Sequence, residues 1–255
     1  MLKLTIFNLL LIVIIAIARV MCKKYVKSKK AQNILLLVAA LLTIAVHYSS
    51  LLYHHLLDNS AFLYLKSNPN LVLPIYPCNV VMWSALIFGL CKNKDSRMTR
   101  FLADYLFWFG IVSTLVGMFA NVDFIQNPTL ADYDVTKGIV AHATLFFNVI
   151  LIAVFGHVKI DFGRNFKNIC LSTLFMYIIG LYCNLLFNLI GSEALAYNVN
   201  SMFIIHSPFE GVDFLRYPVI ALTAIVIYAI LFAICELFAH PKGERWWNKI
   251  KKHSS

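Results

Sequence analysis

Long apolar runs recur along this chain and restrict the folds that are open to it. A run of about 18 or more apolar residues can form a helix that crosses the roughly 30 Å hydrocarbon core of a bilayer. With 60% hydrophobic and 13% charged residues, the 255-residue chain lacks the charge that covers a soluble domain. We therefore predict an all-α, polytopic membrane protein: a single integral membrane domain with a seven-transmembrane-helix bundle and a basic tail over residues 240–255. The predicted spans are residues 4–22, 33–57, 71–91, 101–122, 138–158, 168–190 and 214–239.

The positive charges gather in alternate connections, and this pattern predicts an orientation. The net charge is +10, and basic residues follow the first, third and fifth runs and fill the tail. Because basic connections stay on the cytoplasmic side, we expect a multi-pass protein of the cell membrane with its N-terminus outside and its C-terminus in the cytoplasm. The same placement assigns the charge to topology, so membrane lipids and not nucleic acids are the expected partners. The basic residues of this set are Lys23, Lys24, Lys27, Lys29, Lys30, Lys92, Lys94, Arg97, Arg100, Lys159, Arg164, Lys167, Lys242, Arg245, Lys249, Lys251 and Lys252.

The third run contains a polar, proline-containing segment, "LPIYPCNVVMW" (residues 73–83). Pro74 and Pro77 each remove a backbone donor and free carbonyl groups that need other partners. Broken helix at membrane depth is tolerated where it lines a cavity. Residues 73–79 are therefore predicted to form a kinked wall of a cavity that opens to the outer leaflet.

Polar side chains of several runs fall in the outer half of the predicted bilayer. At 1.5 Å per residue, Cys78 lies about 10 Å below the outer face, His47 about 15 Å and His142 about 6 Å. Polar groups are expensive in contact with lipid, so we expect them to face the bundle interior or a wet cavity. The candidate substrate-binding residues of this group are His47, Tyr76, Asn79, Asn121 and Asn184.

Structural roles compete with chemical roles for these residues. Most buried cysteines are inert packing residues, and Cys78 has the same explanation open to it. His54 and His55 with Asp58 have a spacing that could face one ion, but no further ligand cluster supports a metal site. No glycine-rich phosphate loop and no G-x-S-x-G or H-E-x-x-H motif is present, so neither a metal nor a cofactor is expected.

Three short motifs carry a family resemblance. An "LP-x-x-x-C" segment followed by an asparagine opens the third run, His142 stands in "GIVAHATLFF", and the outer segment "NVNSMFIIHSPFEGVDFL" precedes the last run. Together they resemble the YwaF-like integral membrane proteins, whose relatives include the animal transmembrane-protein-164 family, over roughly residues 35–235. Two departures stand out. Tyr76 and Pro77 precede the cysteine where the family commonly has His-Leu, and Asn200 is not followed directly by an aromatic residue.

The resemblance implies cysteine-dependent acyl transfer on phospholipids without a cofactor. Mapped onto this chain, Cys78 is the nucleophile and His142 the base, while Asn79, Asn184 and Asn200 orient the base or donate to an oxyanion. A free thiol needs a neighbouring base or a positive field to attack an ester at neutral pH. The alternative is a small-molecule transporter or a lipid-binding protein, in which Pro74 and Pro77 form a hinge and Cys78 only packs.

Overall fold

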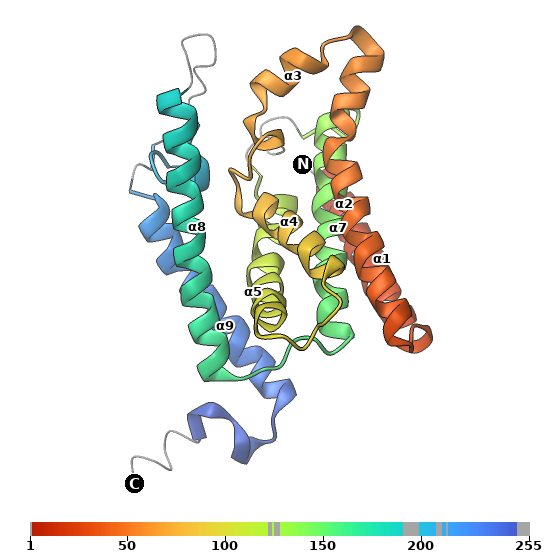
Figure 1. The fold of residues 1–255 in the computed structure, drawn as a ribbon, viewed down its shortest axis with the longest axis vertical. Coiled ribbons are helices and arrows are strands. Elements are labelled where there is room, and N and C mark those ends of the chain that lie inside the picture. Colours follow the sequence, from red (N-terminus) through yellow and green to blue (C-terminus); the bar gives the residue numbers. More distant parts are fainter. Residues whose placement is uncertain are drawn as a thin grey trace.

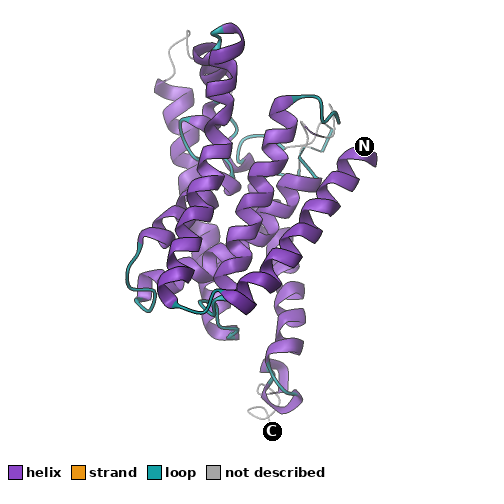
Figure 2. Ribbon diagram, turned by 90° about the vertical axis from the view of Figure 1, so that its right-hand side faces the viewer, coloured by secondary structure: helices purple, strands orange, loops and turns teal. Residues whose placement is uncertain are grey.

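The computed structural model describes residues 2–121, 124, 128–190, 199–207, 211–212 and 214–248. Helices dominate this part of the chain, and no strand occurs in it (Figures 1 and 2). Six helices are long and apolar enough to cross a membrane by length and composition. These are α1 (Leu2–Tyr25), α2 (Lys29–Asp58), α5 (Arg97–Phe119), α7 (Tyr133–Val154), α8 (Phe162–Ile190) and α9 (Tyr217–Ala239). The shorter elements are α3 (Ala61–Ser67), η1 (Pro69–Leu71), α4 (Pro77–Leu90), η3 (Ser201–Phe203) and η4 (Lys242–Glu244).

Six of the predicted spans correspond to these long helices, with ends that differ by a few residues. The third run differs, because its helix α4 begins at Pro77 and has only 14 residues. Proline is favoured at the first helical position, and the residue before it is pushed to an extended backbone, as Tyr76 shows with φ −114° and ψ 154°. The side-chain oxygen of Asn79 accepts a hydrogen bond from the Tyr76 N–H at 3.3 Å. The chain therefore enters α4 through a break and not through a continuous span.

Helices α2, α4, α5 and α7 form the centre of the molecule. Each of α2 and α5 packs against both α4 and α7. Outside this group, α1 packs on α7, α8 on α5, and α9 on α8; α1 and the α8–α9 pair lie on opposite flanks in Figure 1. The apolar core between the central helices includes the fully buried side chains of Leu36, Val81, Leu106, Val149 and Leu151.

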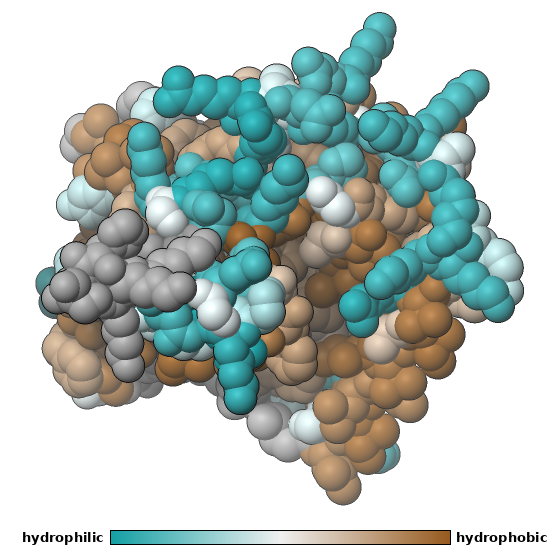
Figure 3. Space-filling model, turned by 90° about the horizontal axis from the view of Figure 1, so that it is seen from below, coloured by the Kyte–Doolittle hydropathy of each residue, from teal (hydrophilic) through white to brown (hydrophobic). Residues whose placement is uncertain are grey.

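The connections α1–α2, α4–α5 and α7–α8, together with residues 240–248, lie at the lower end of the molecule in Figure 1, here called the basic end. Seen from below, this end carries many hydrophilic side chains, while hydrophobic side chains cover much of the flank (Figure 3). The basic connections of the sequence thus lie together at one end of the molecule, and the connections between them in the chain lie at the other end.

A buried ion pair ties α5 to α8 near the basic end. Asp104 is fully buried, and its two carboxylate oxygens accept hydrogen bonds from Nε and Nη2 of Arg164, each at 2.7 Å. The amide nitrogen of Asn168 donates to the same carboxylate at 2.7 Å. A two-pronged pair with a third donor satisfies a charge that burial would otherwise make costly.

Candidate functional site

The break before α4 is closed by a segment from the far end of the chain. The hydroxyl of Ser201 donates to the carbonyl of Ile75 at 2.8 Å, and the N–H of Met202 donates to the same oxygen at 2.9 Å. Further upstream, the Tyr48 hydroxyl donates to the carbonyl of Leu71 at 3.0 Å. Carbonyl groups in non-helical backbone need partners when no water is at hand. Side chains and backbone from α2 and from the 199–206 loop supply them here.

Asn184 of α8 holds the 199–206 loop in place. Its side-chain oxygen accepts from the Ser201 N–H at 2.7 Å, and its amide nitrogen donates to the Ser201 carbonyl at 3.1 Å. Asn184 and Ser201 are both buried. The amide of Asn188, one turn further on, donates to the carbonyl of Val199 at 3.3 Å. The asparagines of α8 thus act on the loop backbone.

Asn200 closes the loop on itself, and the turn that follows is strained. Its side-chain oxygen accepts from the N–H groups of Ile205 and His206 at 3.0 and 3.1 Å, and its amide donates to the His206 carbonyl at 2.8 Å. Met202 and Phe203 have φ of 54° and 56°, a conformation that costs a non-glycine residue on the order of 1–2 kcal/mol. Residues that keep such strain are held by their surroundings and cluster at functional sites.

Gly180 of α8 gives the loop the room it needs. A Cβ atom at this glycine would lie 2.6 Å from Cδ1 of Ile204 and 2.8 Å from Cγ of Met202. No other residue type fits without displacing the strained turn. The 199–206 loop therefore sits directly on the surface of α8, beside the break in the third run.

Cys78 is the second residue of α4 and carries a free, half-buried thiol. The backbone N–H groups of Cys78 and Asn79 interact with its sulfur, and the phenol of Tyr105 on α5 is an electrostatic neighbour. Its side chain packs against the central apolar core, which includes Met202 of the loop. The first turn of a helix presents unpaired N–H groups and a positive dipole end, an arrangement that stabilises a thiolate or another anion.

His142 of α7 has a defined hydrogen-bonding state. Its Nδ1 lies 2.7 Å from the carbonyl of Gly138. A carbonyl only accepts, so Nδ1 carries a proton and Nε2 of the neutral ring is left to accept one. The ring lies against Gly117 of α5, where a Cβ atom would come within 2.2 Å of Nε2, and edge-on to Phe124 at 6.4 Å.

His47 of α2 belongs to the same neighbourhood as His142. Its Nε2 is buried and has no hydrogen-bond partner among the residues that the structure describes. Lys137 and His142 are both within electrostatic range of its ring, and the backbone of Asn70 interacts with it. The predicted site residues therefore fall into two groups. One lies at the start of α4, and the other lies between α2 and α7.

The first group unites residues from two of the three family motifs, the segment around Cys78 and the loop that contains Asn200. Tyr76 and Asn79 flank the thiol, and the ring of Tyr76 lies 5.8 Å from that of Phe203 in the loop that Asn184 and Asn200 organise. His47 and His142 form the second group. Within the described residues, no hydrogen bond joins Cys78 to an imidazole, although α4 and α7 are in contact. Asn121 follows the C-cap of α5 at Ala120.

Several residues of the site escaped sequence reasoning. Ser201 stands where the family pattern has an aromatic residue after the asparagine, and that departure was its only signal. Tyr105, Gly117 and Gly180 gave none, because their roles depend on which helices are neighbours. His54, considered above for a metal site, instead contacts Asp134 of α7 through Nε2 and Oδ2 at 3.0 Å.

Asp134 joins three elements at the end opposite the basic end. Besides His54 of α2, it accepts a hydrogen bond from the hydroxyl of Tyr64 on α3 at 2.8 Å and lies 3.7 Å from Nζ of Lys137. Burial raises the pKa of Tyr64 above its ordinary value, so this phenol keeps the proton that it donates. The contact fixes α3 above the break before α4.

These observations define a polytopic α-helical membrane protein in which a short, proline-broken helix is completed by a polar loop from the far end of the chain. A comparison with family models matches residues 1–236 to the TMEM164 family, and the chain belongs to that family. No curated protein and no solved structure matches the chain.

Proposed function

We propose that this protein transfers acyl groups between membrane lipids, with Cys78 as the nucleophile, in a bundle that α4 completes as the seventh span. The observation that carries the proposal is the position of the thiol in the first turn of α4, a helix that begins after a break in an apolar run. There a thiolate and the oxyanion that forms on attack both meet the positive end of a helix. Membership of the TMEM164 family supports the proposal, because the resemblance described from the sequence motifs implies cysteine-dependent acyl transfer.

The reaction balances without a cofactor. The thiolate of Cys78 attacks the carbonyl carbon of a phospholipid ester, and the tetrahedral oxyanion accepts a hydrogen bond from the N–H group of Cys78 at the positive end of α4. The C–O bond to the glycerol oxygen then breaks, and that oxygen takes the proton removed from the thiol and leaves as a lysolipid hydroxyl. A second lysolipid hydroxyl, or water, attacks the thioester, gives up its proton and restores the thiol.

His142 is the proposed carrier of that proton. Its neutral tautomer leaves Nε2 as an acceptor, and its helix α7 contacts α4. Catalytic hydrogen bonds that are open in a ligand-free enzyme often form only when substrate binds. His47, the neighbouring imidazole, has an unsatisfied Nε2 that suits a polar group of the substrate.

The exposed face of α4 suits a lipid substrate. Tyr76, Trp83, Ile87 and Leu90 are all more than a third exposed, and their spacing places them on one side of the helix. An acyl chain that lies along this face would bring its ester to the first turn of α4, where polar residues replace the apolar ones.

The decisive test uses a long-chain alkyl iodoacetamide, which mimics an acyl chain and alkylates thiolates. We expect it to modify Cys78 selectively in the full-length protein in bilayers, and His142→Ala to slow the modification by about 100-fold or more, the usual contribution of a general base. Incubation with a labelled phospholipid should yield a thioester on Cys78 that hydroxylamine releases. Cys235→Ala, which removes another half-buried thiol, is the matched control and should behave as the unmodified chain.

Gly117 allows a sharper test of the base. In Gly117→Ala the new methyl group would collide with the His142 ring, so labelling of Cys78 should slow. In Gly110→Ala the methyl group would meet Cγ2 of Val149 at 2.5 Å, a similar packing conflict on the same helix but away from the imidazole. Equal slowing in both variants would remove His142 from the mechanism. Equal modification of all cysteines, or of none, would favour a transporter or lipid-binding protein.

A further inference from the structure

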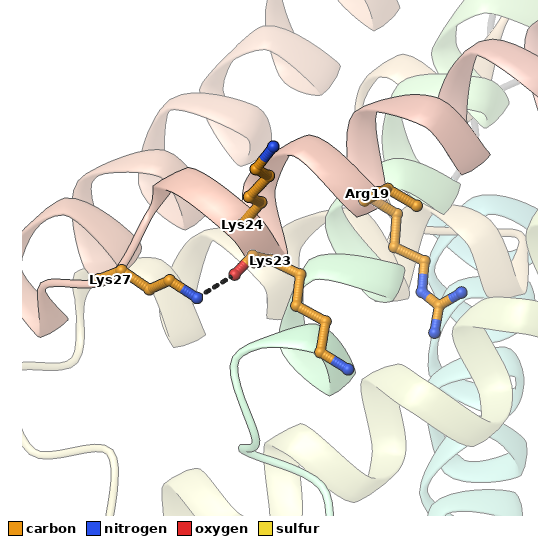
Figure 4. A pocket seen from close by; sticks show the side chains of 5 residues that line it. Arg19, Lys23, Lys24 and Lys27 are labelled. Carbon is orange, nitrogen blue, oxygen red and sulfur yellow. Dashed lines mark hydrogen bonds between the residues drawn. The ribbon is translucent and has the colours of Figure 1, made fainter.

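A hollow of about 390 Å³ lies on the surface at the basic end of α1, far along the chain from the α4 site. It is lined by Arg19, Val20, Lys23, Lys24 and Lys27. Figure 4 shows Arg19 and Lys23 reaching to the same side of the helix, while Lys24 extends to the other side. Lys27 turns back, and its Nζ donates to the carbonyl of Lys23 at 2.7 Å.

The charge of this hollow is uncompensated. Arg19 and Lys23 are four residues apart in α1, so they stand on one face, and like charges at this spacing repel. Lys27 follows beyond the end of the helix at Tyr25. None of the four cations forms an ion pair with a carboxylate in the part of the chain that the structure describes. Lys24 instead lies over the ring of Tyr25 at 5.1 Å. A cluster of four positive charges without a counter-ion is complementary to a polyvalent anion.

The position of the hollow selects the kind of anion. Arg19 lies six residues before the end of α1, about 9 Å deeper along the axis than Tyr25. Val20 lines the same hollow, and the next turns of α1 expose Val13 and Ile17 by more than half. The site thus joins a cationic rim to an apolar helix face. A freely soluble anion gains nothing from that face, whereas a phospholipid has both a phosphate and acyl chains to place.

We infer that this hollow binds the headgroup of an anionic phospholipid from the leaflet at the basic end. The guanidinium of Arg19 offers a two-pronged set of donors to a phosphate, and the lysines add charge around it. The acyl chains of the lipid lie along the exposed apolar face of α1. This site is independent of Cys78 and of the proposed acyl transfer.

Native mass spectrometry of the full-length protein with added phosphatidylserine or chain-matched phosphatidylcholine tests the inference. The variant carries Arg19→Gln, Lys23→Gln and Lys27→Gln together. Each basic residue near an anionic surface contributes about fivefold in binding, so the loss of three should weaken the retention of phosphatidylserine by about 100-fold. The control carries Lys92→Gln, Arg97→Gln and Arg100→Gln, which remove the same charge from the same end and should change binding less than about twofold.

Five outcomes decide the matter. Selective loss in the Arg19 variant, with unchanged thermal unfolding in lipid-free detergent, supports the site. Equal loss in both triple variants would show attraction by the general field of the basic end and overturn it. Equal retention of phosphatidylcholine, or displacement of phosphatidylserine by inorganic phosphate at matched concentration, would also overturn it. Arg19→Lys keeps the positive charge but loses the two-pronged set of donors. An affinity for phosphatidylserine between those of the parent and the triple variant supports phosphate binding by Arg19.

Discussion

His157 lies in the connection that leaves α7, and the buried Nε2 atom of its imidazole has no hydrogen-bond partner among the described residues. Its ring lies edge-on to Phe88 at 5.4 Å. Burial lowers the pKa of His157 below its ordinary value, and the nearby ammonium of Lys94 lowers this pKa further. The carboxylate of Asp95 opposes these effects, and Lys29 adds a smaller lowering. The native fold therefore holds this side chain in its neutral form.

A pH dependence of stability follows from the lowered pKa. Above the unfolded pKa of about 6.5, both folded and unfolded states are neutral at this residue and it adds no pH dependence. As the pH falls below that value, the unfolded chain binds a proton that the folded protein excludes, so stability decreases until the folded pKa is reached. Thermal unfolding between pH 7.5 and 5 should therefore show a falling midpoint, and His157→Phe should reduce the slope. The exposed His55, changed to Gln, is the control and should leave the slope as it is; an unchanged slope in His157→Phe would contradict the assignment.

For the helices, the sequence predicts where they lie along the chain but not which of them pack against one another. The apolar runs predict the long helices to within a few residues, because a span must stay apolar over its whole length. The prolines of the third run predict a break, and the helix does begin at Pro77. That Ser201 would satisfy the broken backbone at Ile75 could not be predicted, since this depends on a contact across 126 residues of sequence. The same holds for the glycine of α5 that makes room for His142.

The pairing between α8 and the 199–206 loop makes a stability prediction. In Asn184→Leu, the buried N–H and carbonyl of Ser201 both lose their partner, at a cost of about 1–3 kcal/mol for each group. We expect a markedly lower midpoint of thermal or detergent unfolding. Asn188→Leu removes a single, longer hydrogen bond from an exposed side chain and should cost below about 1 kcal/mol. Similar losses in the two variants would show that Asn184 does not hold the loop.

At the scale of the whole molecule, the charge pattern and the geometry agree on two ends. The basic connections share one end, and the Asp134 contacts with α2 and α3 lie at the other (Figure 1). Of the polar residues predicted from sequence to lie in the outer half, Tyr76 and Asn79 lie at the break before α4, and His47 lies within electrostatic range of His142. What the sequence leaves open is the path of the chain between Ser67 and Lys92, because α4 alone is shorter than a bilayer.

The basic connection after α4 favours a complete crossing by this segment. The 14 residues of α4 rise about 21 Å, so part of the roughly 30 Å hydrocarbon core must be crossed by the non-helical residues before it. With an impermeant maleimide on intact cells, Ser67→Cys should be labelled directly, and Lys92→Cys only after permeabilisation, each measured against the unmodified chain. The reverse pattern would invert the orientation inferred from the basic connections. Labelling of both positions on intact cells would mean that α4 enters the membrane and returns, so that the bundle has six spans and the basic α4–α5 connection violates the charge rule.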